Sequence, residues 1–393
     1  MAHSKSNKSF RMISLALCLI ALLFAAGFGV NQRVAAMISP AVANFITPVA
    51  QEQDGYFPTT QWRTSRPQDQ ALDKKILKKL VKKIRTGRIG GLDSLLIVRN
   101  GYLVTEEYFH GWGPDDLHTL QSDTKSITSL LVGAALLQGK ISGVNEKVVD
   151  LFPEYQKIKN LDDRKASMSL QDLLTMRTGF DWSEANYQGS PLQQLNDCQC
   201  DWMKFVLNWP MREDPGTRFE YNSGGVILLG GVIRNATGMP TDVFAQRSLF
   251  DPLGITQVRW YYGQDGSPHT GGGLNMRPRD MAKIGYLVLR NGRWEDKQLV
   301  SEDWLKQAMQ HAVRSPRTFG SHWVDYGYLW WLLPLEAEGP DADIYTASGA
   351  LGQWIFIIPR FDMVVVVTGN AQTYADWVGP VEFLYTDILR AVQ

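Results

Sequence analysis

The sequence lacks several features that would assign it to whole classes of protein. Forty basic and forty acidic residues cancel, so no overall field attracts nucleic acid or an anionic membrane surface. Only six histidines are present, and none stands in an H-E-x-x-H or similar ligand spacing. The triple glycine Gly271–Gly273 is not followed by G-K-[ST], so turn flexibility explains it better than a phosphate cradle. We therefore expect no nucleic-acid partner, no metal and no other cofactor.

Cysteine is also scarce, with three residues in the chain. Cys18 falls in an apolar N-terminal segment, which leaves Cys198 and Cys200 for the folded part. A disulfide between them would close a very small, strained ring, and C-x-C without further ligands is a weak metal signal. We expect two free or loosely paired surface thiols.

The N-terminus carries a basic flank followed by the uncharged apolar segment Met12–Val30. A buried helix of the folded domain is one explanation, but the basic flank and the terminal position favour an export signal. The apolar length also suffices for a membrane span. We expect residues 1–36 to be a signal peptide or signal anchor and residues 37–55 a tether. The protein would then be exported to the periplasm, soluble after cleavage or attached to the membrane through residues 12–30.

The remaining residues, 56–393, form an ordinary globular composition, with 44% apolar and 20% charged residues overall. The spacing predicts an amphipathic helix over 69–86, and Asn100-Gly101 between two β-rich runs predicts a hairpin. Near the C-terminus, "YGYLWWLLP", "GQWIFIIP" and "DMVVVVTGN" are typical of strands, and a final helix is expected over 374–392.

Strands at both ends therefore surround a helical middle. This order predicts an α+β fold, in which an antiparallel sheet built from both chain ends has flanking helices and a largely helical inserted subdomain. We expect residues 56–121 and 271–393 to form the α/β part and residues 122–270 the helical part.

The segment "LQSDTKSITSLLVGAALLQGK" contains the first chemical signal. It predicts a helix from near Ser122 to Gly139, apolar on almost every side and hence buried. Lys125 stands in its first turn, where the helix dipole disfavours a cation. Burial disfavours the charged form of an amine, so Lys125 can act as a base for the Ser122 hydroxyl on the same helix face. A Ser-x-x-Lys tetrad alone is weak, because a chain of this length contains about one by chance.

The surrounding sequence raises the value of this tetrad. From about Trp62 to the C-terminus it resembles the serine β-lactamase and penicillin-binding-protein superfamily. The resemblance is stronger to the branch that contains class C β-lactamases, family VIII esterases and 6-aminohexanoate-dimer hydrolases. The segments that carry it are "SLLIVRNGYLVTEEYF", "SDTKSITSLLVGAALLQGKI", "LQDLLTMRTGFDWSE", "PGTRFEYNSGGVILLGGVI", "PLGI", "GGGLNMRPRDMAKIGYLVLRNG" and "ASGALGQWIFIIP".

The resemblance implies roles for individual residues. Ser122 matches the acylated nucleophile, Lys125 the neighbouring lysine, and Tyr221 in "YNS" the tyrosine that shuttles protons. A core tyrosine is the alternative for Tyr221. The family pattern also implies an oxyanion hole made by the backbone N–H groups of Ser122 and Ala350. Ser223 replaces the usual asparagine and is a candidate substrate contact.

The third family motif departs from the pattern. Lys or His normally stands first in K-T-G or H-x-G and helps to bind a carboxylate. Here the tripeptide is Ala347-Ser348-Gly349, with no adjacent replacement cation, which argues against β-lactam hydrolysis. Ser348, Gly349 and Tyr187 are further candidate substrate contacts. The tandem tryptophans 330 and 331 either line an apolar pocket or belong to the core.

We interpret the sequence as an exported serine hydrolase that cleaves a small-molecule ester or amide through an acyl-enzyme on Ser122. Lys125 and Tyr221 would act as general base and acid. A D-amino-acid or cell-wall peptidase, or a weak β-lactamase, is the first alternative. A catalytically silent binding protein on the same scaffold is the second, although it would predict loss of Ser122, Lys125 or Tyr221.

Overall fold

The computed structural model describes residues 55–335 and 342–393. Residues 56–393 form one compact unit. The predicted signal segment, residues 1–36 with the apolar stretch 12–30, and all of the tether except Gly55 lie outside the described residues. Within the described ranges, no helix is both long and apolar enough to cross a membrane.

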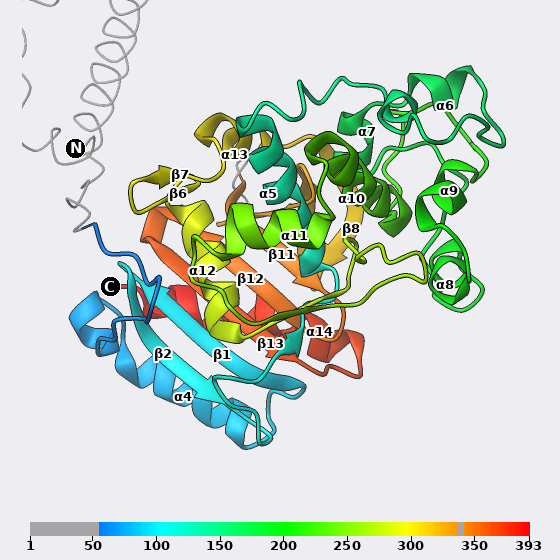
Figure 1. Ribbon diagram of the computed structural model, residues 1–393. Coiled ribbons are helices and arrows are strands. Elements are labelled where there is room, and N and C mark those ends of the chain that lie inside the picture. The colour runs from blue at the N-terminus through cyan, green and yellow to red at the C-terminus, as the bar shows by residue number, and fades with distance from the viewer. Residues whose placement is uncertain (1–54, 336–341) are drawn as a thin grey trace, which may run out of the picture. The chain divides into compact units, whose positions relative to one another are not determined.

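Eight antiparallel strands form the main sheet in the order β2-β1-β13-β12-β11-β10-β9-β8. The strands from the two chain ends are neighbours, because β1 pairs with β13. This arrangement, visible as cyan beside orange-red strands in Figure 1, is the predicted sheet built from both ends. The strands are β1 (Leu92–Arg99), β2 (Tyr102–Tyr108), β8 (Val313–Phe319), β9 (His322–Tyr326), β10 (Trp331–Pro334), β11 (Ala342–Gly349), β12 (Gln353–Ile358) and β13 (Met363–Gly369).

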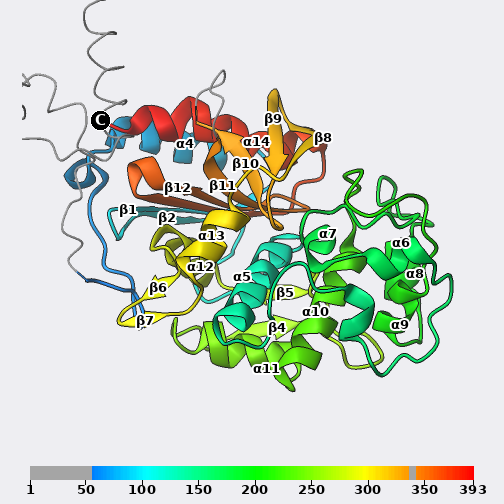
Figure 2. The ribbon, with the colours of Figure 1, turned by 90° about the horizontal axis from the view of Figure 1, so that it is seen from above.

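Helices cover both faces of this sheet. Figure 2 shows α4 (Lys74–Arg85) and α14 (Tyr374–Phe383) on one face and α12 (Pro278–Leu289), α13 (Glu302–Ala308) and α5 (Asp123–Leu137) on the other. The strand β13 is buried along its whole length, as its continuous apolar sequence predicts for a sheet centre. The sheet therefore carries the α5 helix, with the Ser-x-x-Lys tetrad, on its α12 side.

A mainly helical part lies beside the sheet, at the right of Figure 2. It also contains a small sheet in the order β3-β5-β4, which the sequence does not predict. Its elements are α6 (Asp163–Ser167), α7 (Leu170–Leu174), α8 (Pro191–Asp197), α9 (Trp202–Leu207), α10 (Ser223–Thr237), α11 (Thr241–Ala245), β3 (His118–Thr119), β4 (Val258–Trp260) and β5 (Leu274–Met276). The short strands β6 (Arg293–Trp294) and β7 (Lys297–Gln298) pair separately.

Local signals account for several element boundaries. Asn100 and Gly101 both have positive φ, at 51° and 75°, as a two-residue hairpin turn with the right twist requires. The predicted helix over 69–86 begins later, at Lys74, because Asp73 accepts from the N–H groups of the first turn and caps it. Residues 67–70 form a separate 3₁₀ turn.

The two cysteines of the folded part contradict the expectation of free or loosely paired thiols. Cys198 and Cys200 form a disulfide, with their Cα atoms 5.2 Å apart. That separation is within the normal range for bridged cysteines. The connection between α8 and α9 turns sharply enough to bring them together, which the spacing alone does not show.

Candidate active site

Ser122 precedes the first residue of α5 and adopts helical backbone angles. Its side chain makes no capping hydrogen bond to the helix, unlike the serines that start α7, α8 and α13. The hydroxyl instead accepts a hydrogen bond from the Lys125 ammonium, with 3.1 Å between Nζ and Oγ. The tetrad is therefore in contact across one turn of the helix, as the spacing predicts.

Lys125 is buried, with 2% of its surface exposed. Its Nζ donates to the carbonyl oxygen of Gly271 at 2.6 Å as well as to Ser122. No carboxylate among the described residues lies within ion-pair distance of it. An unpaired buried lysine is unfavourable for stability, so this position is explained better by chemistry than by packing.

Tyr221 stands immediately before Asn222, whose side chain caps α10 by accepting from the N–H of Gly225. The cap fixes where the chain enters α10 and so fixes the tyrosine. Lys125 Nζ lies 4.8 Å from the centroid of the Tyr221 ring, and Trp331 stacks on the same ring at 5.9 Å. Lys125 thus has Ser122 and Tyr221 as neighbours. Trp331 supports the tyrosine, whereas Trp330 is fully buried in the core.

Arg317, on the edge strand β8, was not identified from the sequence. Its guanidinium carbon lies 4.5 Å from the centroid of the Tyr221 ring, within cation–π range. No carboxylate among the described residues forms an ion pair with it. The third motif has no cation of its own, since its first residue is the buried Ala347. Arg317 brings a positive charge to Tyr221 from β8, which lies three strands away from β11, the strand that carries Ala347.

The end of β11 packs directly against the segment that precedes the nucleophile. A Cβ atom on Gly349 would overlap the carbonyl oxygen of Leu120, so only glycine permits this approach. The Gly349 carbonyl accepts from the Trp377 indole at 2.8 Å. Next in the chain, Ala350 is held through its carbonyl, which accepts from the buried Gln353 amide at 3.3 Å. Gly349 therefore acts through the backbone and has no side chain to bind substrate.

The predicted oxyanion hole consists of two backbone N–H groups. Ser122 begins the α5 helix, where N–H groups point outward, and Ala350 follows the last residue of β11. Neither N–H donates to another group in the part of the chain that the structure describes. Both donors are thus available to a negatively charged oxygen.

Ser223 makes a structural contact that the sequence did not reveal. Its hydroxyl donates to Glu184 Oε2 at 2.9 Å, and its backbone N–H donates to Oε1 of the same carboxylate at 2.5 Å. The Trp182 indole also donates to Glu184. Glu184 therefore satisfies one free N–H group at the start of α10, and the Ser223 hydroxyl is already engaged.

Two other predicted substrate contacts are placed but remain predictions. Ser348 lies opposite Trp354 in the β11–β12 ladder, is buried, and its hydroxyl has no partner among the described residues. Tyr187 is 54% exposed, and its hydroxyl accepts a weak hydrogen bond from Asn196 at 3.3 Å. No hydrogen bond or ring contact within the described ranges joins Tyr187 to Ser122, Lys125 or Tyr221.

The triple glycine begins in a turn, as expected, and close packing also constrains it. None of its three residues has a positive φ. A Cβ on Gly273 would lie 2.7 Å from the His269 Cβ, and one on Gly271 would lie 3.2 Å from the Ser223 carbonyl. Close packing therefore requires glycine at 273 and favours it at 271, whose carbonyl oxygen accepts from Lys125.

Two buried titratable groups adjoin this constellation. Burial raises the pKa of Asp123, next to Ser122, well above its usual range, and neither of its oxygens has a partner among the described residues. Burial, together with the nearby Lys125 charge, lowers the pKa of His269 to about 4. Both side chains are therefore neutral near pH 7. Within the described ranges, no cluster of His, Cys, Asp or Glu could hold a metal ion.

A buried lysine that contacts a helix-start serine and lies next to a tyrosine fits the class of serine hydrolases. The comparison with known families agrees with this class. The family model described as Beta-lactamase matches residues 75–378, and the chain belongs to that family.

Individual relatives have low sequence identity to this chain but match most of its length. The chain is 25% identical over 326 residues to 6-aminohexanoate-dimer hydrolase of Paenarthrobacter ureafaciens, covering 76% of this chain and 78% of that one. Among solved structures, the hydrolase EstCE1, with promiscuous acyltransferase activity, is similar with a TM-score of 0.66 and 16% identity, over 81% of this chain and 99% of that one. The octameric penicillin-binding protein homologue from Pyrococcus abyssi has a TM-score of 0.59 and 19% identity, over 81% and 78%. The structural likenesses establish the β-lactamase-like fold.

Proposed function

We propose that this protein is a serine hydrolase that cleaves a small-molecule ester or amide through an acyl-enzyme on Ser122. The observation that carries the proposal is the 3.1 Å contact between Lys125 Nζ and Ser122 Oγ, made by a buried lysine without a carboxylate partner among the described residues. A serine hydroxyl becomes a useful nucleophile when such a neighbour takes its proton.

The proposed reaction has two halves. In the first, the Ser122 proton passes to the Lys125–Tyr221 pair while Oγ bonds to the substrate carbonyl carbon. The carbonyl oxygen becomes an oxyanion, held by the N–H groups of Ser122 and Ala350. The bond to the leaving group then breaks, and the leaving group takes the proton through Tyr221. In the second half, water gives a proton to the same pair and attacks the acyl carbon. The bond between that carbon and Oγ then breaks, Ser122 Oγ takes the proton, and the acid product leaves.

The substrate class is inferred from the site and from relatives. Ala347 provides no cation at the first position of the third motif, which argues against β-lactams. The relatives named as 6-aminohexanoate-dimer hydrolase and as the hydrolase EstCE1 support linear amides and esters. We also propose export through residues 1–36; fractionation of cells and the mass of the mature N-terminus test it.

Hydrolysis of p-nitrophenyl acetate and butyrate tests the function. We expect turnover and a mass increase equal to one acyl group on Ser122. Ser122→Ala should abolish both, and Lys125→Met should lower kcat by about 10²–10⁴-fold because the base is lost. Ser129→Ala is the matched control, since Ser129 is a buried serine of the same helix. A folded protein that forms no adduct with these esters or with a fluorophosphonate would favour the silent binding protein.

A peptidase that acts on substrates with a free carboxylate is the second candidate, and Arg317 is the observation that favours it. The guanidinium can pair with a carboxylate on the leaving group from its place over Tyr221. Benzylpenicillin decides between the candidates. Stable acylation of Ser122, weakened in Arg317→Gln, would support the peptidase, whereas ester turnover without penicillin acylation would support the first function.

A further inference from the structure

A cavity of about 620 Å³ lies beside the turn that follows β11. Its lining includes Leu351, the residue after Ala350, and Thr119, three residues before Ser122. Consecutive Cα atoms are only about 3.8 Å apart, so the cavity adjoins the proposed oxyanion hole. None of the predicted site residues lines it.

The sheet order shows which part of a substrate this cavity faces. Tyr221 is in ring contact with Trp331 of β10 and Arg317 of β8. The cavity is lined instead by Asp93 of β1 and by Asn370, just after β13. These two groups of strands lie on opposite sides of β11. Because Tyr221 would protonate the leaving group, the leaving group lies on its side and the acyl group extends toward the cavity.

One wall of the cavity is apolar. Trp112 lies against His118, with ring centroids 4.4 Å apart, and Leu117 and Leu351 also contribute to the lining. Trp112 and Leu351 are partly exposed large apolar side chains, at 37% and 38%. Covering such apolar surfaces with methylene groups is favourable, because it removes both from water.

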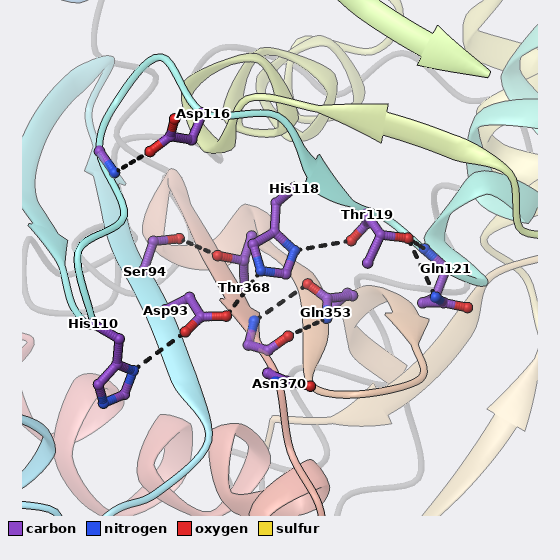
Figure 3. A network of polar contacts seen from close by, with 12 residues as sticks. Asp93, Ser94, His110, Asp116, His118, Thr119, Gln121, Gln353, Thr368 and Asn370 are labelled. Atoms are coloured by element: carbon purple, nitrogen blue, oxygen red, sulfur yellow. Dashed lines mark hydrogen bonds and ion pairs between the residues drawn. The ribbon is translucent and has the colours of Figure 1, made fainter. Parts of the chain in front are cut away.

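The polar wall contains a carboxylate and an arginine that form no ion pair with each other. Figure 3 shows Asp93 between two histidines, with Oδ2 2.9 Å from His118 Nε2 and Oδ1 3.3 Å from His110 Nδ1. Both carboxylate oxygens are therefore occupied. Arg259 also lines the cavity, and among the described residues its guanidinium donates a hydrogen bond only to the Asn275 amide oxygen, at 3.5 Å. No carboxylate among the described residues lies within ion-pair distance of Arg259.

We propose that this cavity is the acyl-binding site and that it selects acyl chains ending in a carboxylate. Methylene groups pack on Trp112 and Leu351, and the terminal carboxylate pairs with Arg259 beside Asn275. The inference rests on the proposed function, because it identifies the acyl part of the substrate of the same site. It assigns half-esters or half-amides of aliphatic dicarboxylic acids as the substrate class.

Three matched p-nitrophenyl esters test the selectivity: the hemiadipate, the hexanoate and the 6-aminohexanoate, which end in carboxylate, methyl and ammonium. In the full-length protein, kcat/KM should be highest for the hemiadipate. Arg259→Gln should lower the hemiadipate-to-hexanoate ratio about tenfold, the effect of one charge-assisted hydrogen bond, with hexanoate cleavage nearly unchanged. Arg293→Gln, which alters another exposed arginine, should leave the ratio unchanged. An unchanged ratio in Arg259→Gln, or a preference for the ammonium ester, would overturn the proposal.

A binding measurement separates this proposal from the proposed function. Adipate should quench tryptophan fluorescence in Ser122→Ala protein, because Trp112 lines the cavity, and the quenching should disappear when Arg259→Gln is added. If the wild type cleaves no ester but adipate still binds through Arg259, the hydrolase assignment fails and the site stands. If esters are cleaved but adipate does not bind, the acyl-site assignment fails and the hydrolase stands.

Discussion

Asp123 occupies the first turn of α5, where a negative charge would suit the helix dipole. Full burial nevertheless keeps its carboxyl neutral, with its pKa well above the usual range. A proton on this group removes a negative charge that would otherwise oppose a developing oxyanion at the neighbouring Ser122. The position of Asp123 in the helix predicts a charged carboxylate, but burial keeps the carboxyl neutral, which the sequence does not reveal.

Asp123→Asn should stabilise the protein relative to the wild type increasingly as pH rises above about 4. The folded-state pKa of Asp123 lies above its unfolded value, so its contribution to stability is complete below about pH 4 and declines as pH rises toward the folded value. Asparagine does not titrate and preserves the shape. The free energy of unfolding, measured with urea, should rise for the variant relative to the wild type from about pH 5 to about pH 8. A stability difference that is constant over that range would contradict the buried, neutral carboxyl.

His269 should make the protein sensitive to acid. Its pKa is about 4 in the folded protein against about 6.5 in an unfolded chain. Its contribution is therefore present above about pH 6.5 and is lost as pH falls toward 4, to a total of about 3 kcal/mol. The free energy of unfolding of His269→Gln, measured with urea, should fall less over this pH range than that of the wild type. In Lys125→Met, the pKa of His269 measured by NMR should rise, because the Lys125 charge contributes to lowering it. An unchanged pKa would show that the Lys125 charge does not act on His269.

At the scale of elements, the start of α5 and the end of β11 form the central contact. The helix start supplies Ser122 and one N–H, and the strand end supplies the other N–H, at Ala350. Neither element alone holds the complete predicted oxyanion hole. The spacing between them is set by Gly349, whose missing side chain lets β11 reach the Leu120 carbonyl, and by the buried Gln353, which binds the Ala350 and Gly369 carbonyls.

Gly349→Ala should impair acylation more than folding. The new methyl group would overlap Leu120, so the turn that carries the Ala350 N–H must move relative to Ser122. A displacement of about 1 Å can cost about 10²-fold in rate, while overpacking costs about 1–3 kcal/mol of stability. Burst kinetics with p-nitrophenyl butyrate measure the first effect and urea unfolding the second. Gly143→Ala is the control, since nothing lies within 4 Å of its added methyl; equal acylation rates in both variants would show that the contact is not needed.

For the whole molecule, the sheet joins the two ends of the folded unit. β13 is buried and pairs with β1 on one side and β12 on the other. Pairing strands so far apart in the chain closes a long loop, which costs conformational entropy and slows folding. The site therefore depends on the C-terminal strand, although β13 itself contains no predicted catalytic residue.

Deletion of residues 359–393 should abolish cooperative folding. The deletion removes β13 and α14, leaves β1 and β12 without their shared partner, and exposes apolar strand edges to aggregation. Circular dichroism should show no sharp thermal transition, and size-exclusion chromatography should show aggregates. Removal of Gln393 alone, which loses one backbone bond to Ala71, should cost little. A soluble, cooperatively unfolding protein after the longer deletion would refute the central role of β13.

Local features of this protein could be predicted from its sequence. Periodicity and turn residues predicted the β1–β2 hairpin, the buried α5 helix and the central strand β13, because these signals depend on residues close together in the chain. The Ser-x-x-Lys spacing placed Ser122 and Lys125 on one helix face for the same reason. The ordered motifs indicated the family, which the family model matches over residues 75–378.

Only the tertiary structure decided the features that join distant segments. It placed Arg317 over Tyr221, engaged Ser223 with Glu184, bridged Cys198 and Cys200, and put the cavity on the side of β11 away from the tyrosine. Such contacts depend on strand order, chain direction and packing, for which residue spacing carries no direct signal. The same limit applies to charge: the sequence showed a third motif without a cation, and only the folded sheet showed which arginine stands nearby.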